Sequence, residues 1–258
     1  MISKNQNLKI ATILPYKENY SFSKASAASL WVSEFFKSSK YKKYNFIYGN
    51  TNQKDFLTEN YINITLKSLK SKFKSSTSEY SEKLIKEIKN KKFDIIEIHN
   101  RPLIFFKLIK GFKGKYIFYF HNDPLSMKGS RSTKERLAIL RYADKIIFVS
   151  EWTRDRFFHD IDRKLQTKTE IVYPSIKKQS KTKKEKIITF VGKLNESKGY
   201  DLFKEAVTKI LNEFHKWKAF SIGDEDRRNI YINHKNHSEL GFLKHKKALN
   251  ILNKSEIA

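Results

Sequence analysis

The chain has 258 residues, and its 53 Lys and Arg against 27 Asp and Glu give a formal net charge of +26. Aromatic residues make up 14% of the chain, which excludes a disordered basic tail, because disordered chains are poor in aromatic residues. The absence of cysteine excludes disulfide bonds, Cys-ligated zinc, iron–sulfur clusters and cysteine nucleophiles.

Short apolar segments typical of strands alternate with longer amphipathic segments. The expected strands are Leu8–Leu14, Asn45–Tyr48, Asp94–His99, Tyr116–His121, Lys145–Ser150, Glu170–Tyr173, Lys186–Val191, Lys218–Ile222 and a turn strand around Glu239–Leu243. The expected helices are Ser26–Ser38, Ser78–Lys91, Ser132–Tyr142, Glu151–Phe158, Tyr200–Phe214 and Lys244–Asn253. Several strands are apolar at nearly every position, as strands covered on both faces are. The alternation predicts an α/β fold with a doubly wound parallel sheet.

A change of composition divides the chain into two domains. Residues 176–185 are polar and strongly basic without apolar periodicity, which is typical of a linker. We therefore expect an N-terminal Rossmann-like domain over residues 1–175 and the start of a second over residues 186–258. A doubly wound domain of about 70 residues buries little core, and Ile257 and Ala258 resemble the first residues of another buried strand. We accordingly expect the second domain to be incomplete in this chain.

The excess of positive charge is open to several interpretations. Only nine of the 53 basic residues are Arg, whereas nucleic-acid readers use Arg for bidentate contacts to guanine and phosphate. A general excess of Lys, Asn and Ile is also typical of AT-rich coding. The functional alternative is a phosphate-bearing ligand or an anionic membrane surface. No RNP, zinc-finger or helix-turn-helix signature is present, so no nucleic-acid partner is expected.

Two basic stretches bear on membrane association. Residues 66–74 place Leu66, Leu69 and Phe73 at helical spacing among lysines, and residues 102–115 mix bulky apolar residues with lysine. Such stretches either lie on anionic lipid or bury their apolar face against a sheet. The N-terminus lacks an apolar segment of signal-peptide length, and no segment approaches ~18 uninterrupted apolar residues. We expect a cytoplasmic protein, with peripheral association at the inner face of the membrane as an alternative.

Residues at strand ends carry the candidate chemistry, because open α/β sheets bind ligands beyond the carboxyl ends of their strands. The loop from Pro15 leads into a helix of small residues, where Ser26 either helps to bind an anion or is an ordinary N-cap. His99-Asn100 and His121-Asn122 each end a strand, with a proline two residues after the Asn. Histidine can bind sugar hydroxyls or transfer protons; the alternative is a histidine that only completes a turn. No His or carboxylate pair has the helical spacing of a zinc site, so no metal is expected.

The segment Phe190–Tyr200 follows the first strand of the second domain and leads into a helix. Gly192 allows close approach of a ligand to the backbone, and Lys193 and Lys198 lie on either side of the loop and could reach a diphosphate. The order of residues differs from that of a P-loop. The alternatives are a phosphate-binding loop and a solvated basic loop.

Together these segments resemble glycosyltransferase family 4, retaining enzymes of the GT-B architecture with two Rossmann-like domains. The matching segments are the loop after Pro15, Asp94–Pro102, Tyr116–Asp123, Ala143–Thr153, Val172–Ser175 and Val191–Gly199. The last resembles the family motif Gly-Arg-Leu-x-x-x-Lys-Gly, which holds the nucleotide diphosphate. Three features depart from the family. Lys193 replaces the Arg, the first loop has Lys24-Ala25-Ser26 where paired glycines are usual, and the acidic Pro-Ser…Glu-x7-Glu segment is absent.

The resemblance implies a glycosyltransferase of the hexosyltransferase type that moves a sugar from a nucleotide-sugar to a glycan or lipid-linked acceptor with retention, in cell-envelope polysaccharide or lipopolysaccharide synthesis. Gly192, Lys193 and Lys198 would then bind the donor diphosphate without a metal or cofactor. His121 would be catalytic at the donor sugar. Ser26, His99 and Asn100 would face the acceptor. The alternatives are a remnant without catalytic activity and a basic protein that binds polyanions or anionic membranes.

Overall fold

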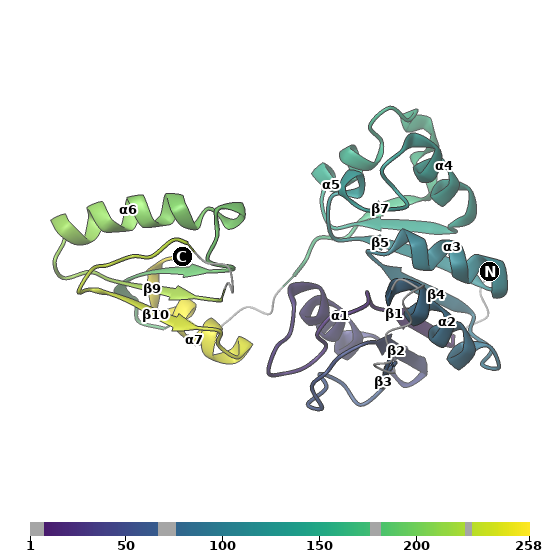
Figure 1. The fold of residues 1–258 in the computed structure, drawn as a ribbon, viewed down its shortest axis with the longest axis horizontal. Helices are drawn as coiled ribbons and strands as arrows, with labels where there is room; N and C mark the ends of the chain where they lie inside the picture. Colours follow the sequence, from purple (N-terminus) through teal and green to yellow (C-terminus); the bar gives the residue numbers. More distant parts are fainter. Residues whose placement is uncertain (1–7, 67–75, 176–181, 225–228) are drawn as a thin grey trace. The chain divides into compact units, whose positions relative to one another are not determined.

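The computed structural model describes residues 8–66, 76–175, 182–224 and 229–258. The chain divides into two compact units, residues 1–175 and residues 176–258 (Figure 1). Residues 176–181 of the expected linker lie outside the described residues. The expected linker extends too far at its other end, because Glu185 already belongs to the first strand of the second unit.

The first unit is built on one seven-stranded sheet in which every neighbouring pair of strands is parallel. The strands are β1 Ile10–Ile13, β2 Asn45–Gly49, β3 Tyr61–Asn63, β4 Ile95–His99, β5 Lys115–Phe120, β6 Lys145–Phe148 and β7 Thr169–Ile171. Their order is β3-β2-β1-β4-β5-β6-β7. The direction in which strands are added therefore reverses beside β1, which confirms the predicted doubly wound sheet.

Helices cover both faces of this sheet. They are α1 Ala27–Ser38, α2 Ser76–Ile88, α3 Pro102–Gly111, α4 Thr133–Tyr142 and α5 Glu151–Phe157. Val32 and Phe36 of α1 pack in one apolar cluster with Ile47 of β2, whereas α2 to α5 contribute to a separate cluster with the alternate strand residues, such as Ile96 and Phe118. Figure 1 shows α1 on one side of the sheet and α2 and α3 on the other. Right-handed crossovers require this change of face when the strand order reverses.

The predicted pattern missed one strand of the first unit, and for the basic stretch 102–115 the structure confirms the alternative in which its apolar face is buried against the sheet. β3 has only three residues and lies at the sheet edge, so it shows too little alternation to be recognised. α3 lies within the basic stretch 102–115, where Ile104, Phe105 and Leu108 are fully buried against the sheet. Residues 67–74 of the other basic stretch lie outside the described residues.

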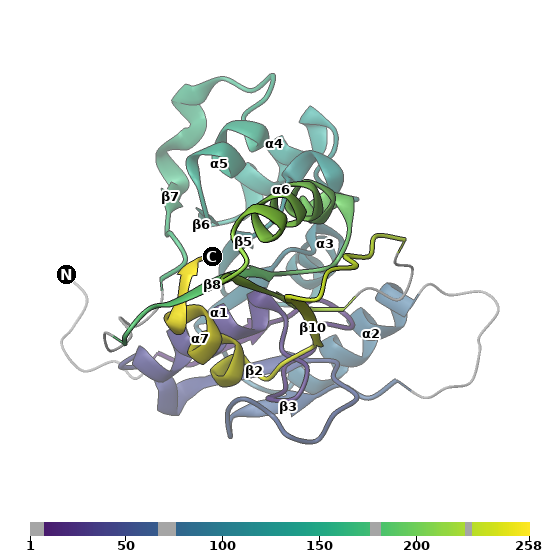
Figure 2. The ribbon, with the colours of Figure 1, turned by 90° about the vertical axis from the view of Figure 1, so that its left-hand side faces the viewer.

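The second unit is a smaller parallel sheet in the order β10-β9-β8-β11. Its elements are β8 Glu185–Val191, α6 Tyr200–Glu213, β9 Lys218–Ile222, β10 His237–Gly241, α7 His245–Lys254 and β11 Ser255–Ile257. Helices α6 and α7 lie on opposite faces of the sheet (Figures 1 and 2). A strand near the end of the chain, β11, pairs with β8, but it ends at Ile257, where the expected buried strand would begin, and Ile257 is exposed.

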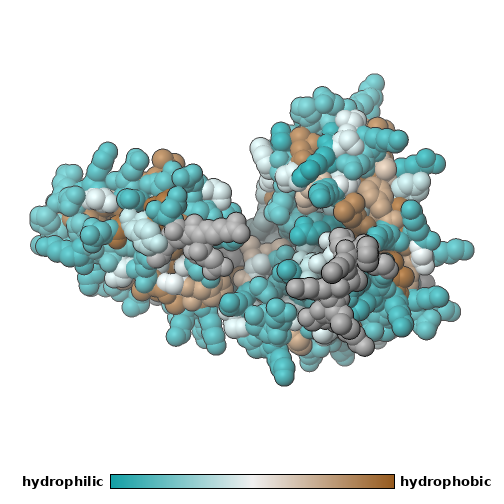
Figure 3. Space-filling view, in the orientation of Figure 1, coloured by the Kyte–Doolittle hydropathy of each residue, from teal (hydrophilic) through white to brown (hydrophobic). Residues whose placement is uncertain are grey.

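The face of the molecule that Figure 3 shows is strongly polar. On the face drawn in Figure 3, hydrophilic side chains spread over both units, and the apolar ones are scattered among them. Among the helices of the described residues, none combines the length and apolarity needed to cross a bilayer.

Candidate functional site

The first candidate site lies at the carboxyl ends of β4 and β5. His99 ends β4 and His121 follows β5, and the two imidazoles meet with 2.8 Å between Nδ1 of His99 and Nε2 of His121. Their rings are nearly parallel, with centroids 5.1 Å apart, and the ring of Tyr119 stacks on that of His99 at 4.5 Å. The structure thus joins two predicted site residues in one hydrogen-bonded pair.

Helix α1 contributes an aromatic wall to this pair. The Trp31 ring lies edge-on to both imidazoles, with centroid distances of 5.9 Å to His99 and 5.1 Å to His121. The sequence prediction missed Trp31. The available signal was a single large aromatic residue in a helix that begins with small residues and follows the first strand.

Asn100 connects the two strand ends through its side chain. It adopts a left-handed conformation with φ of 52°, which Asn tolerates better than most residues. Its Oδ1 accepts hydrogen bonds from the backbone N–H groups of His121 at 2.7 Å and Asn122 at 3.2 Å. This amide oxygen therefore serves to position His121.

A salt bridge fixes the turn that follows His121. The Arg156 guanidinium of α5 donates two hydrogen bonds to the Asp123 carboxylate, at 3.2 and 3.0 Å. Burial alone would raise the pKa of Asp123, but the bonds from Arg156 and from the Leu125 N–H lower it. Two kinds of contact thus hold the segment after β5: its backbone N–H groups bond to Asn100, and the Asp123 carboxylate bonds to Arg156.

Burial keeps both imidazoles neutral. It lowers the pKa of His121 from 6.5 to about 4, and burial together with the neighbouring His121 lowers the pKa of His99 well below 6.5. Nε2 of His99 is buried without a hydrogen-bond partner among the described residues. If the proton of His99 lies on Nδ1, its buried Nε2 is an acceptor without a donor. If the proton lies on Nε2, a buried N–H has no acceptor, which costs more free energy. The first tautomer is therefore favoured, and in it the His99 Nδ1–H donates to Nε2 of His121. The more stable arrangement therefore places the proton of His121 on Nδ1, the nitrogen left for a ligand.

The His121 pKa predicts a dependence of stability on pH. A histidine with a lower pKa in the folded protein binds fewer protons when folded, so acid favours unfolding between pH 6.5 and about 4. At about 1.4 kcal/mol per pKa unit, His121 should lower the free energy of unfolding by on the order of 3 kcal/mol across this range. Glu97, whose pKa burial raises, acts in the opposite direction in wild type and variant alike. Urea unfolding should therefore show a weaker loss of stability in acid for His121→Gln than for wild type; equal losses would contradict the assignment.

Ser26 occupies the N-cap of α1, as one of its two interpretations predicted. Its Oγ accepts a hydrogen bond from the Ser29 N–H at 3.1 Å and also bonds to the Glu18 carboxylate. The hydroxyl is thus used within the loop after β1. Ser26 is not part of the contacts that join His99, Asn100 and His121.

The second candidate site is the loop after β8, in the second unit. Leu194 anchors the loop in the core, and residues 196–198 form a short 3-10 helix that ends at Gly199, whose φ is 73°. Lys193 and Lys198 are exposed. A Cβ atom built on Gly192 would lie 3.9 Å from Cβ of Lys198, so these two predicted residues are neighbours.

A further glycine, missed by the sequence prediction, supports this loop. Gly223 follows β9 with φ of 144°, and a Cβ atom there would lie 1.8 Å from the carbonyl oxygen of Gly192. The Gly192 N–H donates to the carbonyl oxygen of Ile222 at 3.0 Å. The ends of β8 and β9 therefore approach so closely that only glycine fits, and the sole signal was a glycine directly after a predicted strand.

Within the described part of the chain, His, Asp and Glu form no group of three that could hold an ion. The two candidate sites are the imidazole pair of the first unit and Lys193 and Lys198 in the loop after β8.

Comparison with known proteins places these features in a family. The profile of glycosyltransferase family 4 matches residues 52–178, and among curated proteins no sequence matches the chain. Three similar solved structures are Anabaena HepE in complex with UDP-glucose (13% identity, TM-score 0.65, 92% of this chain and 69% of that one), Thermosynechococcus elongatus sucrose-phosphate synthase (12%, 0.66, 96% and 74%) and a Rickettsia africae glycosyltransferase (13%, 0.62, 96% and 71%). The profile match identifies residues 52–178 as glycosyltransferase family 4, and the similar solved structures show that the chain has the GT-B fold.

Proposed function

We propose that the protein transfers a hexosyl group from a nucleotide-sugar to a glycan or lipid-linked acceptor with retention of configuration. The loop after β8 carries the proposal: Lys193 and Lys198 are exposed beside Gly192, and neither forms an ion pair with a carboxylate of the described residues. A nucleotide diphosphate presents the negative charge that two such lysines attract. The similar fold of HepE, solved with UDP-glucose, supports a donor of this class.

In the proposed reaction the bond between the anomeric carbon and the diphosphate oxygen breaks. A bond from the acceptor hydroxyl oxygen forms on the same face of the sugar, and the hydroxyl proton passes to the departing diphosphate oxygen. Lys193 and Lys198 stabilise the negative charge that develops on the diphosphate, an electrostatic role that requires no metal or cofactor. His121 donates a hydrogen bond to the donor sugar from Nδ1, because its Nε2 is bonded to His99. The first unit binds the acceptor.

We place this activity at the cytoplasmic face of the cell envelope, in the synthesis of polysaccharide or lipopolysaccharide. The net charge of +26 would attract the protein to anionic lipid. At α3 the attraction would come from charge and not from insertion of apolar side chains into lipid, because Ile104, Phe105 and Leu108 are buried in the core.

A donor titration tests the proposed function. Isothermal calorimetry with UDP-, GDP-, ADP- and dTDP-sugars should show binding of one nucleotide class, weakened by salt. NMR of the transfer product should show the anomeric configuration of the donor. Failure to bind any nucleotide-sugar, together with salt-sensitive binding of DNA, would instead favour the basic polyanion-binding protein that the net charge suggests.

A further inference from the structure

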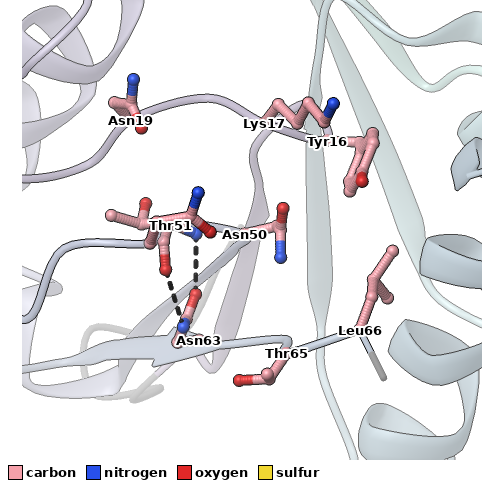
Figure 4. A pocket seen from close by; sticks show the side chains of 9 residues that line it. Tyr16, Lys17, Asn19, Asn50, Thr51, Asn63, Thr65 and Leu66 are labelled. Atoms are coloured by element: carbon pink, nitrogen blue, oxygen red, sulfur yellow. Dashed lines mark hydrogen bonds between the residues drawn. The ribbon is translucent and has the colours of Figure 1, made fainter. Parts of the chain in front are cut away.

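A polar cavity of about 470 Å³ lies at the carboxyl ends of the first three strands of the seven-stranded sheet (Figure 4). The loop after β1 supplies Tyr16, Lys17 and Asn19. The end of β2 and the loop after it supply Asn50, Thr51 and Asn52, and the end of β3 with the residues beyond it supplies Asn63, Thr65 and Leu66. Its volume is in the range of small-molecule sites. It lies on the same edge of the sheet as the imidazole pair but is lined by different residues.

The floor of the cavity is held rigidly by hydrogen bonds. The Asn63 side chain accepts from the Thr51 N–H at 2.8 Å and donates to the Thr51 carbonyl at 2.9 Å, as Figure 4 shows. The Thr51 hydroxyl accepts from the Tyr61 hydroxyl at 2.9 Å and from the Tyr20 N–H at 2.9 Å. These bonds tie the loops after β1 and β2 to each other and to strand β3, so the cavity walls are positioned before a ligand binds.

Other polar groups around this floor are left for a ligand. The side chains of Tyr16, Asn19, Asn52 and Thr65 form no hydrogen bond with any residue that the structure describes. Asn50 donates its amide to the Ile64 carbonyl at 2.8 Å, while its Oδ1 forms no such bond. Each free amide or hydroxyl side chain can both donate and accept.

The balance of charge selects the class of ligand. Lys17 is the one charged residue that lines the cavity among the described residues, and its ammonium group lies 5.5 Å from the centroid of the Tyr16 ring. A phosphate or carboxylate group needs several donors or cations, whereas a sugar hydroxyl both donates and accepts, as amide and hydroxyl side chains do. Tyr16 and Leu66 add an apolar wall that fits the C–H faces of a sugar ring (Figure 4).

We propose that this cavity binds uncharged sugar units, and that these belong to the saccharide acceptor. Binding of sugar units by the cavity is independent of the proposed function. Their assignment to the acceptor rests on it. The acceptor would then be a neutral glycan, and the cavity would bind sugar units next to the one that carries the reacting hydroxyl. A lipid that is recognised through its phosphate group would not match this lining.

Saturation-transfer NMR and calorimetry on the full chain test the proposal, with maltotriose, xylotriose and triacetylchitotriose as probes. At least one should bind, and Asn19→Ala/Thr65→Val should weaken it by roughly tenfold, since two hydrogen bonds are lost. Asn52→Ala provides a second variant at an exposed position. Asn212→Ala/Thr167→Val deletes the same groups from exposed sites outside the cavity lining and should leave affinity unchanged.

A Lys17→Gln variant separates neutral from anionic ligands. It should remove any binding of inorganic phosphate, because Lys17 is the charged residue of the described lining, whereas saccharide binding should stay measurable, because the glutamine amide still donates and accepts hydrogen bonds. Inorganic phosphate that binds the wild type and is lost in Lys17→Gln, without saccharide binding, would overturn the proposal. So would the absence of binding by every trisaccharide at millimolar concentration, or equal affinity in wild type and cavity variants. UDP binding, measured in parallel, separates this proposal from the proposed function. If UDP binds and no trisaccharide does, only the proposal for the cavity is wrong. If a trisaccharide binds and UDP does not, the cavity binds sugar but the proposed transferase function is wrong.

Discussion

Replacing Lys198 with alanine should abolish sugar transfer and weaken the binding of a nucleoside diphosphate. Lys198 is exposed next to Gly192, without a carboxylate partner among the described residues, so its charge is available to the donor phosphates. Removing a group that stabilises charge in the transition state typically costs about 10²- to 10³-fold in rate. Calorimetry with UDP-, GDP- and ADP-type nucleotides and a transfer assay measure the two effects.

Two further variants separate the role of this lysine from general charge. Lys209→Ala removes the same charge from an exposed position in α6, away from the loop, and should leave binding and transfer close to wild type. Lys198→Arg keeps the charge and should recover part of the binding. Near-normal turnover of Lys198→Ala, or an equal loss in Lys209→Ala, would remove the phosphate-binding role from Lys198.

Gly223→Ala should destabilise the second unit and disorder the loop after β8. The new Cβ would lie 1.8 Å from the Gly192 carbonyl oxygen, in a backbone conformation with φ of 144° that side chains rarely adopt. Because the clash is with backbone, a rotamer change cannot relieve it, and either β8 or β9 must move at its carboxyl end. We expect a loss of about 3 kcal/mol or more in the free energy of unfolding of this unit, together with loss of nucleotide binding.

Tryptophan fluorescence can follow this unit alone. Trp217 is the one tryptophan in residues 176–258, so replacing Trp31 and Trp152 with phenylalanine leaves a reporter of the second unit. Gly111→Ala is the control for a glycine-to-alanine change without a clash. A Cβ at Gly111 meets no atom within 4 Å, and alanine has a higher helix propensity than glycine in α3, so this variant should not lose stability. A Gly223→Ala protein with an unchanged urea midpoint and normal nucleotide binding would contradict the close approach of the two strand ends.

Several parts of the fold follow from the sequence because their signals are local. The strand over Lys145–Phe148 is apolar at most positions and follows a capped amphipathic helix, so both were recognised, as was the αβ alternation that gives parallel sheets. Ser26 was a recognisable helix start. By contrast, β3 forms by pairing with β2 over three residues, and that pairing depends on tertiary contacts.

The candidate site divides in the same way. The sequence placed His99 and His121 at strand ends and Lys193 and Lys198 around a glycine loop, since position relative to a strand is a local property. It could not show that the two imidazoles share a hydrogen bond, because that depends on the register of β4 against β5. Nor could it identify Trp31, whose role depends on the face over which α1 crosses.

The sequence by itself therefore determined the fold class, the boundary between two α/β units and the types of residue at the strand ends. The tertiary structure decided which of them meet. Strand order and register join His99 to His121, bring Gly223 against Gly192, and enclose the cavity around Thr51 and Asn63. These contacts connect residues far apart in the chain, and their geometry depends on packing between elements, which no local pattern encodes.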